Sequence, residues 1–161
     1  MTAIYLAIKL YIQQKFPDVL HIDLWNEQIL NIEDEVPFSR PAIFVEFGDI
    51  LWNNVSKASK TGTVPTTLHI VTDCYDVRAD DADSLSALDR LDQTSEKFDN
   101  LKIPKCTPFM PTSTAIDNNH GNLIHNTLSY TFDLKLHIRG GENLLEVEPN
   151  LKVTGTFLQN G

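Results

Sequence analysis

The sequence predicts an α+β fold: a two-layer domain in which a mixed, mainly antiparallel sheet carries two helices packed on one face. From Thr127 to Ile138 polar and apolar residues alternate without interruption, which is typical of a long strand with one buried face. Two other stretches repeat apolar residues every three or four positions, as amphipathic helices do. Helices that bury one stripe against one side of such a sheet define the α+β class.

The first predicted element is a helix over residues 3–16, where apolar residues recur at helical spacing. Pro17 ends it, because proline cannot continue a helical hydrogen-bond ladder. A short strand follows, with Leu20, Ile22 and Leu24 predicted on one side.

A long hairpin is predicted next. Ala42–Trp52 is the first strand, and Gly48 in its middle indicates a bulge or bend. Pro65 is expected to open the second strand, Thr66–Tyr75. Between them, residues 53–63 are polar and predict a loop with a mobile tip.

The second half contains a predicted helix that starts near Asp80, in an acidic segment that suits the positive end of the helix dipole, and ends after Phe98. Residues 102–122 hold three prolines and many small polar residues, which predicts an irregular connection. The long final strand then completes a single domain over residues 1–140. Residues 141–161 are expected to form a C-terminal tail, with one further short strand over Lys152–Leu158.

Composition limits the function. The chain has 161 residues and a formal net charge of −9, without a Lys/Arg cluster, so gripping the phosphate backbone of DNA is not expected. Cys74 and Cys106 are far apart in sequence, and free intracellular thiols are favoured over a disulfide. A basic segment typical of a signal peptide is missing at the N-terminus, and no stretch is apolar enough for a membrane span. We therefore expect a protein made in the cytoplasm that has no membrane partner.

A metal site is the first chemical alternative. His69 and Asp73 share one face of a predicted strand, and Asp133 and His137 share one face of another. If the two strands were neighbours, these four side chains could converge as ligands of a small metal-dependent enzyme. The simpler interpretation is favoured: they are polar residues on the wet face of a sheet, and none of the usual close ligand spacings occurs. The sequence thus predicts no catalytic residue, cofactor or metal.

Two other groups of residues have a chemical and a structural interpretation. His120 and His125 flank the start of the last strand, where either could be a base in a loop, but the neighbouring Asp, Asn and Gly residues favour a turn. Glu46 and Asp49 lie near Gly48, and paired acids at a bulge need no catalytic role. Cys74 is expected in the core of its strand rather than as a nucleophile.

The predicted loop 53–63 is the favoured contact surface for a partner, since long loops without structure of their own are often binding elements. Its charges are Lys57 and Lys60, in an acidic protein. The predicted partner-contact residues are Asn53, Asn54, Lys57, Lys60, Thr61 and Gly62.

Three strings resemble a known family. They are RPAIFVEFGDILW at Arg40–Trp52, TTLHIVTD at Thr66–Asp73, and DNNHGNLI with the following LSYTF within Asp117–Phe132. With the order of elements, they are similar to small tail proteins of long-tailed bacteriophages and prophages, in particular tail terminator (tail completion, minor tail protein U-like) proteins. The resemblance covers roughly residues 1–140.

The resemblance implies a structural protein without catalysis or cofactor. Such proteins form a ring of six copies on the last ring of the tail tube, stop tube growth and meet the connector of the head. The implied partners are further copies of the chain, the tail tube protein and the head–tail connector, with DNA only passing through the lumen. An acidic lumen would let DNA slide without binding. The implied location is the host bacterial cytoplasm during assembly and then the virion tail. The alternative within this class is a head–tail connector or neck protein.

Overall fold

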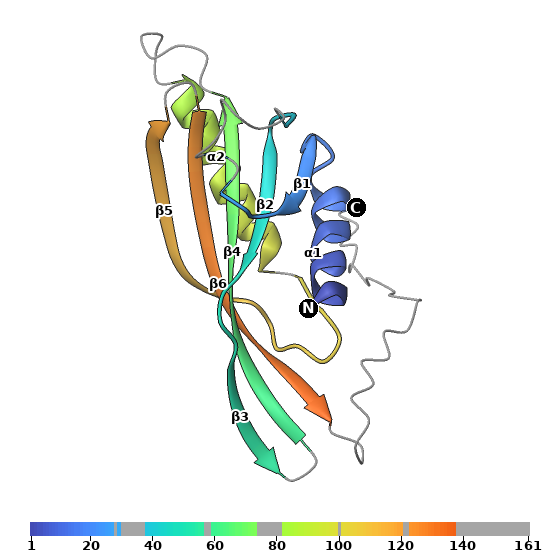
Figure 1. Ribbon diagram of the computed structural model, residues 1–161. Coiled ribbons are helices and arrows are strands. Elements are labelled where there is room, and N and C mark those ends of the chain that lie inside the picture. Colours follow the sequence, from blue (N-terminus) through green and yellow to red (C-terminus); the bar gives the residue numbers. More distant parts are fainter. Residues whose placement is uncertain are drawn as a thin grey trace, which may run out of the picture.

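The computed structural model describes residues 1–27, 29, 38–56, 59–73, 82–99, 101–120 and 123–137, apart from the side chains of residues 82–85, 118–120 and 137. Within them the chain forms two helices and six strands, an α+β fold as predicted (Figure 1). In order, the elements are α1 (Thr2–Lys15), β1 (His21–Leu24), β2 (Ala42–Phe47), β3 (Leu51–Ser56), β4 (Ser59–Asp73), α2 (Ala82–Phe98), β5 (Met110–His120) and β6 (Leu123–His137).

The strands form one mixed sheet in the order β1-β2-β4-β6-β5, and β3 pairs with β4 beyond the end of β2. The β1–β2 pair is parallel, and the other described pairs are antiparallel. β4 and β6 pair along their full lengths, from Ser59↔His137 to Asp73↔Leu123. This central pair therefore fixes the long axis of the molecule.

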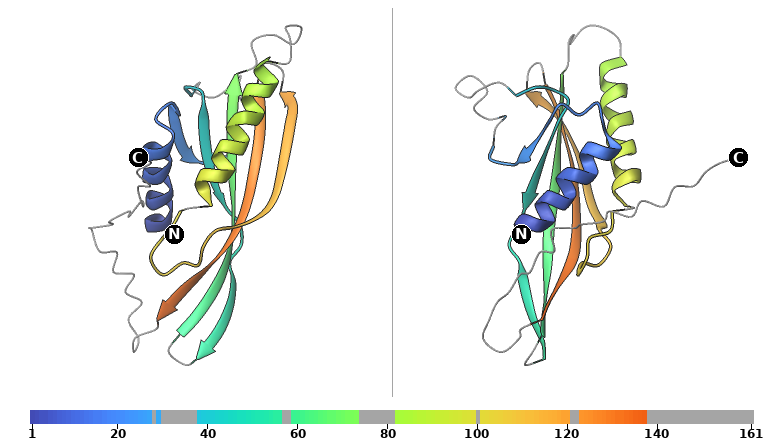
Figure 2. Two further views of the ribbon diagram at one scale, coloured as in Figure 1. Left: turned by 180° about the vertical axis from the view of Figure 1, so that it is seen from behind. Right: turned by 90° about the vertical axis from the view of Figure 1, so that its right-hand side faces the viewer.

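Both helices cover the same face of the sheet (Figure 2). The alternation predicted for the last strand is confirmed, because Leu128, Tyr130 and Phe132 of β6 are buried under the helices. From the helices, Ile8 of α1 and Phe98 of α2 are fully buried in this cluster. The two-layer arrangement with helices on one face is therefore confirmed.

Polar contacts connect the two helices and the segment between α1 and β1. Arg90 of α2 forms an ion pair with Asp18. Lys97 of α2 donates a hydrogen bond to the carbonyl of Lys15 and lies over the ring of Phe16, with its Nζ 4.6 Å from the ring centroid. Both described cations of α2 are thus engaged on the side of the helix that faces α1.

A break at Gly48 separates β2 from β3, in agreement with the predicted bend. The Gly48 N–H donates to the carbonyl of Pro65 in β4 at 2.9 Å, and a Cβ on Gly48 would lie 3.2 Å from the Cβ of Pro65. The N–H and C=O of one strand residue point to the same neighbouring strand. The N–H group that Pro65 lacks would therefore have pointed to the break between β2 and β3, and not to β6. For this reason the β4–β6 ladder continues past this proline.

The prediction that Pro65 opens its strand is wrong. β4 starts at Ser59, six residues earlier, because Pro65 is accommodated at the break rather than ending the strand. The predicted loop over residues 53–63 is wrong for the same reason: Leu51–Ser56 and the start of β4 pair as an antiparallel hairpin. Cross-strand pairing on a continuous β4 outweighs the polar composition of this segment.

The predicted irregular connection over residues 102–122 is wrong over its second part. Residues 110–120 form β5, an edge strand paired with β6. A strand can contain Pro111 at an edge, and here the register shifts between Pro111 and Ser113. Thr112 and Thr114 are β-branched and suit a sheet, which the turn-like composition of the segment concealed.

Two smaller differences concern the ends of the chain. Of the three residues predicted on one side of the first strand, Ile22 of β1 is buried, whereas Leu24 of β1 and Leu20, which precedes it, are exposed. Cys74 and the possible strand Lys152–Leu158 lie outside the described residues, as does the boundary at residue 140.

Candidate assembly surface

A three-stranded arm extends from the body of the molecule, beyond both helices (Figure 1). We define the arm as residues 51–56 of β3, 59–63 of β4 and 133–137 of β6. All six β3 side chains are exposed, on both faces of the strand. A strand such as β3 that is solvated on both faces gains little from burial within its own chain. The arm is therefore the part of the fold that burial within the chain explains least.

One face of the arm continues the apolar surface of the core. Trp52 lies directly opposite Gly62, and Gly62 lies opposite Leu134 of β6. A Cβ on Gly62 would lie only 2.7 Å from Cε3 of Trp52 and 2.7 Å from Cγ2 of Ile50, so glycine is required for the ring to lie across β4. Nζ of Lys60 is 4.2 Å from the centroid of Trp52, a cation–π contact. Even so, Trp52 remains 41% exposed.

The opposite face of the arm also carries apolar side chains. Leu51 and Val55 of β3 are each 67% exposed. Beside them, the hydroxyl of Thr63 donates to Oδ1 of Asp133 at 2.7 Å, which ties β4 to β6. Exposed apolar side chains next to polar ones are typical of contact surfaces when they are gathered in one place.

The predicted partner-contact residues lie on this arm, although not in a loop. Asn53 and Asn54 are exposed in β3, Lys60 and Thr61 are half-buried in β4, and Gly62 is buried under Trp52. Lys57 lies outside the described residues. Leu51, Trp52 and Val55, the apolar residues of the arm, were not among the predicted contact residues. The available signal was that they lie close together in an otherwise polar stretch.

The four residues of the alternative metal site do not converge. β4 and β6 are antiparallel neighbours, but His69 pairs opposite Thr127, whereas Asp133 pairs opposite Thr63. Six residues of strand separate these positions, roughly 20 Å. Asp73 is instead ion-paired with Arg40. Among the described residues no group of three or more His, Cys, Asp and Glu side chains is placed to hold a metal ion.

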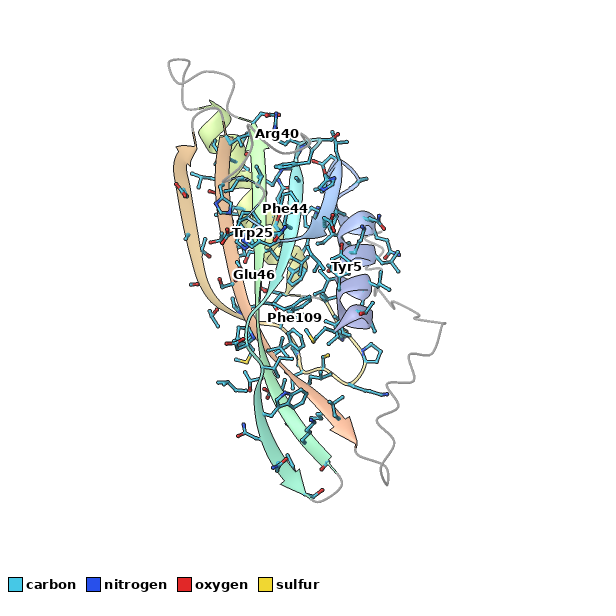
Figure 3. All side chains as sticks on the ribbon, in the orientation of Figure 1. Tyr5, Trp25, Arg40, Phe44, Glu46 and Phe109 are labelled. Atoms are coloured by element: carbon cyan, nitrogen blue, oxygen red, sulfur yellow. The ribbon has the colours of Figure 1, made fainter. Side chains whose placement is uncertain are left out.

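His69 belongs to a different cluster, on the sheet face opposite the helices. His125 Nε2 and His69 Nδ1 are 2.9 Å apart, and His69 Nε2 is 2.9 Å from Oε2 of Glu46. A carboxylate only accepts, so His69 donates from Nε2 and its Nδ1 accepts from His125. The ring of Trp25 stacks on His69 with the centroids 3.8 Å apart. Figure 3 shows Trp25, Phe44 and Glu46 grouped on this face.

Burial lowers the pKa of His69, and the hydrogen bond and charge of Glu46 oppose this shift. His125, which the sequence placed in a turn or as a loop base, is instead buried in β6. Neither earlier interpretation of His125 is correct, since antiparallel pairing brings it beside His69 from 56 positions away. The covering ring of Trp25 and the satisfied hydrogen bonds make this cluster a packing element of the open face.

Cys106 also has a structural environment. It forms an isolated bridge to Leu134 at the base of the arm, and burial raises the pKa of its thiol to about 11. A thiol of that pKa stays protonated at neutral pH, and the thiolate is the reactive form. Cys106 is therefore a poor nucleophile.

Comparisons with known proteins indicate the fold. No family model matches the chain, and no curated protein matches its sequence. A chain of a solved structure titled "Virion of native gene transfer agent (GTA) particle" has a similar fold, with a TM-score of 0.52 and 9% sequence identity. The match covers 82% of this chain and 94% of that chain, so nearly the whole of the other chain is included. Among the described residues, no helix is both long and apolar enough to cross a membrane.

Proposed function

We propose that this chain is a structural protein of phage-like virion assembly, and specifically a tail terminator that caps the tail tube as a ring and mediates joining to the head. The observation that carries the proposal is the exposed arm on a fold shared with a chain of a gene transfer agent virion. The resemblance of Arg40–Trp52, Thr66–Asp73 and Asp117–Phe132 to tail terminators points the same way. The ring is expected to contain six copies.

The arm supports an assembly role for a physical reason. When a partner covers apolar side chains such as Leu51, Trp52 and Val55, the free energy falls by about 25 cal/mol per Å² of apolar surface removed from water. The arm is also held in shape before it binds, by Trp52 over Gly62 and by the Thr63–Asp133 hydrogen bond. A surface that is already ordered binds with a smaller entropy cost.

The chemistry of the other clusters supports a structural rather than a catalytic role. The two ring nitrogens of His69 are hydrogen-bonded, Nε2 to Glu46 and Nδ1 to His125, and Trp25 covers the ring. We propose that the protein acts without cofactor or metal and works through its surfaces. The predicted partners are further copies of the chain, the tail tube protein and the head–tail connector. DNA would pass through the acidic ring without specific binding.

Deleting the gene and imaging the particles by electron microscopy tests this function. A tail terminator is required to stop the tube, so the deletion should give tubes of irregular, extended length without heads. Native mass spectrometry of tails from the intact strain should find six copies of the chain. Tails of normal length that fail to join heads would favour the alternative, a connector or neck protein. Normal particles after deletion would exclude a role in the virion.

A further inference from the structure

The outer edge of β3 lacks the features that usually keep an exposed strand from pairing with another chain. Proline, lysine or another charged residue on the edge is the common protection. The six residues of β3, LWNNVS at Leu51–Ser56, include none of these, and all six side chains are exposed. Among the described strands β3 pairs with β4 alone, so its other edge is open. The register of β3 shifts only near the tip, between Asn54 and Ser56.

The register also shows which backbone groups of β3 point to this open edge. The Gly48 N–H donates to the carbonyl of Pro65, so that carbonyl points to the side of β4 where β2 and β3 lie. Backbone direction alternates along a strand, so Gly62, three residues from Pro65, points to β6 instead. Trp52 lies opposite Gly62, and its N–H and C=O therefore point away from β4. Asn54, two residues further on, points outward in the same way.

A second copy of β3 matches this edge. Two copies related by a two-fold axis across the edge pair antiparallel, and the outward residues Trp52 and Asn54 must face each other. Three registers satisfy this rule: Trp52 opposite Trp52, Trp52 opposite Asn54, and Asn54 opposite Asn54. In the first Leu51 faces Asn53, and in the third Val55 faces Asn53. Only the second register places Leu51 of one copy opposite Val55 of the other, and it does so twice.

In that register the facing groups are compatible. Leu51 and Val55 are each 67% exposed in one copy, so they would cover each other across the two strands. Trp52 lies opposite the amide of Asn54, and Asn53 lies on the axis, opposite its own counterpart. No like charges face each other, because β3 carries no charge.

We propose that two copies of the free chain pair through β3, with Trp52 of each copy opposite Asn54 of the other. The arms then form one antiparallel sheet, in which β6-β4-β3 of one copy is followed by β3-β4-β6 of the other. The arm extends beyond the body, and antiparallel pairing directs the two bodies to opposite ends, so the bodies do not collide (Figure 1). The two-fold contact concerns the chain before it joins a tail and does not depend on a ring.

The pairing protects the arm but is small. It covers the open edge together with Leu51 and Val55. The two pairs of Trp52 and Asn54 exchange four backbone hydrogen bonds, and each such bond contributes little net stability in water. The dimer is therefore weak and is populated at high protein concentration, which leaves the arm accessible to other partners on dilution.

A single cysteine on the two-fold axis tests the register. Asn53 lies opposite Asn53 of the second copy, and its backbone groups point to its own β4. Such a pair has its Cα atoms about 4.5 Å apart, a separation that a disulfide spans. The variant is Asn53→Cys in a chain whose native cysteines are replaced (Cys74→Ala and Cys106→Ala). Asn54→Cys in the same background is the matched control: it replaces another exposed asparagine, which lies diagonally from its counterpart, about 7–8 Å away.

Mild oxidation at high protein concentration should link the Asn53→Cys chain into dimers, with no larger species on a denaturing gel, and reduction should separate them. Asn54→Cys should link on the order of tenfold more slowly, because cysteines with Cα atoms more than about 7 Å apart cannot be bridged without backbone movement.

Charges at the same position test the two-fold symmetry independently. Asn53→Lys and Asn53→Asp each place like charges opposite each other, so each variant alone should self-associate several-fold more weakly than the wild type. In a 1:1 mixture unlike charges face each other, and association should return at least to the wild-type strength, as measured by sedimentation velocity. Ser113→Lys, a similar change on the exposed edge strand β5, is the control and should leave self-association unchanged.

Restored association in the mixture also shows that both charge variants fold. The inference is overturned if Asn54→Cys links as fast as Asn53→Cys, if the mixture associates no better than either variant alone, or if Ser113→Lys weakens association as much as Asn53→Lys. A wild-type chain that stays monomeric at millimolar concentration would overturn it too. None of these results changes the particles expected after gene deletion, which test the proposed function separately.

Discussion

β4 and β6 run through both the body and the arm of the molecule, but the surroundings of these two strands differ between the two regions. In the body, Leu68 and Leu128 are buried under the helices, and Trp25 covers His69 on the other face. In the arm, the same ladder continues while β3 beside it is exposed on both faces. The alternation of polar and apolar residues favours a strand in both the body and the arm. What covers the strand decides whether its side chains belong to the core or stay accessible to a partner.

The largest effect is expected from a core change in the body. Phe132→Ala removes a ring that is 2% exposed and packs against Phe109, with centroids 4.5 Å apart. The free energy of unfolding should fall by about 3–5 kcal/mol, measured by denaturant unfolding. Lys135→Ala, three residues further along β6 and exposed, should cost less than about 0.5 kcal/mol. Similar losses for the two variants would show that the comparison between body and arm is false.

A smaller effect is expected at the packed face of the arm. Gly62→Val introduces side-chain atoms where a Cβ alone would lie 2.7 Å from the Trp52 ring. The ring must move, so unfolding should become easier by about 1–3 kcal/mol, the usual range for overpacking. Tryptophan fluorescence should shift to longer wavelength as Trp52 enters water. Thr61→Val, one residue away and on the other face, is the control and should leave the emission unchanged.

A pH effect is expected from the open face of the body. The pKa of His69 is lowered by burial from its ordinary value of 6.5. Below pH 6.5 the unfolded chain binds a proton that the folded chain does not, so the free energy of unfolding falls as pH falls. The loss continues down to the lowered pKa of the folded state. His125, Glu46 and Asp117, which pairs opposite His125, are the ionisable neighbours on this face.

His69→Gln removes this titration and keeps a polar side chain. Thermal melting of the variant between pH 7.5 and 5 should therefore depend less on pH than melting of the wild type. If the melting temperatures of the two proteins change equally with pH, His69 does not contribute to the acid sensitivity of the body.

The smallest effect on stability is expected at the exposed face of the arm. Leu51→Ser and Val55→Ser change side chains that are 67% exposed, so the free energy of unfolding should stay within about 0.5 kcal/mol of the wild type. If this face contacts a partner, assembly should nonetheless weaken, as measured by sedimentation velocity. A large loss of stability with unchanged assembly would reverse the roles given to body and arm.

Patterns that depend on the chain's own local period could be predicted from the sequence. The burial of Leu128, Tyr130 and Phe132 follows from strict alternation, and both helices follow from apolar spacing. The bend at Gly48 was also visible. These features depend on neighbours in sequence, so composition and period were sufficient.

Features that depend on distant partners could not be predicted in the same way. β5 and the start of β4 are strands because β6 provides a ladder for them, which overrides prolines and polar residues. The His69–His125 contact joins positions 56 residues apart in sequence. For the candidate site, the sequence and the structure point to the same segment, but the sequence predicted a loop there, because the pairing of Asn53 with Thr61 is invisible in a polar stretch.

The central claim is that the arm is dispensable for the fold and indispensable for assembly. Shortening it tests both halves: Asn54–Lys60 is replaced by Asn-Gly, which suits a two-residue hairpin turn and preserves the pairing of Asn53 with Thr61. The account predicts a body that melts close to the wild-type temperature. Electron microscopy of particles that carry the variant should show tails of irregular length or tails that lack heads. Normal particles with the shortened arm would contradict the claim.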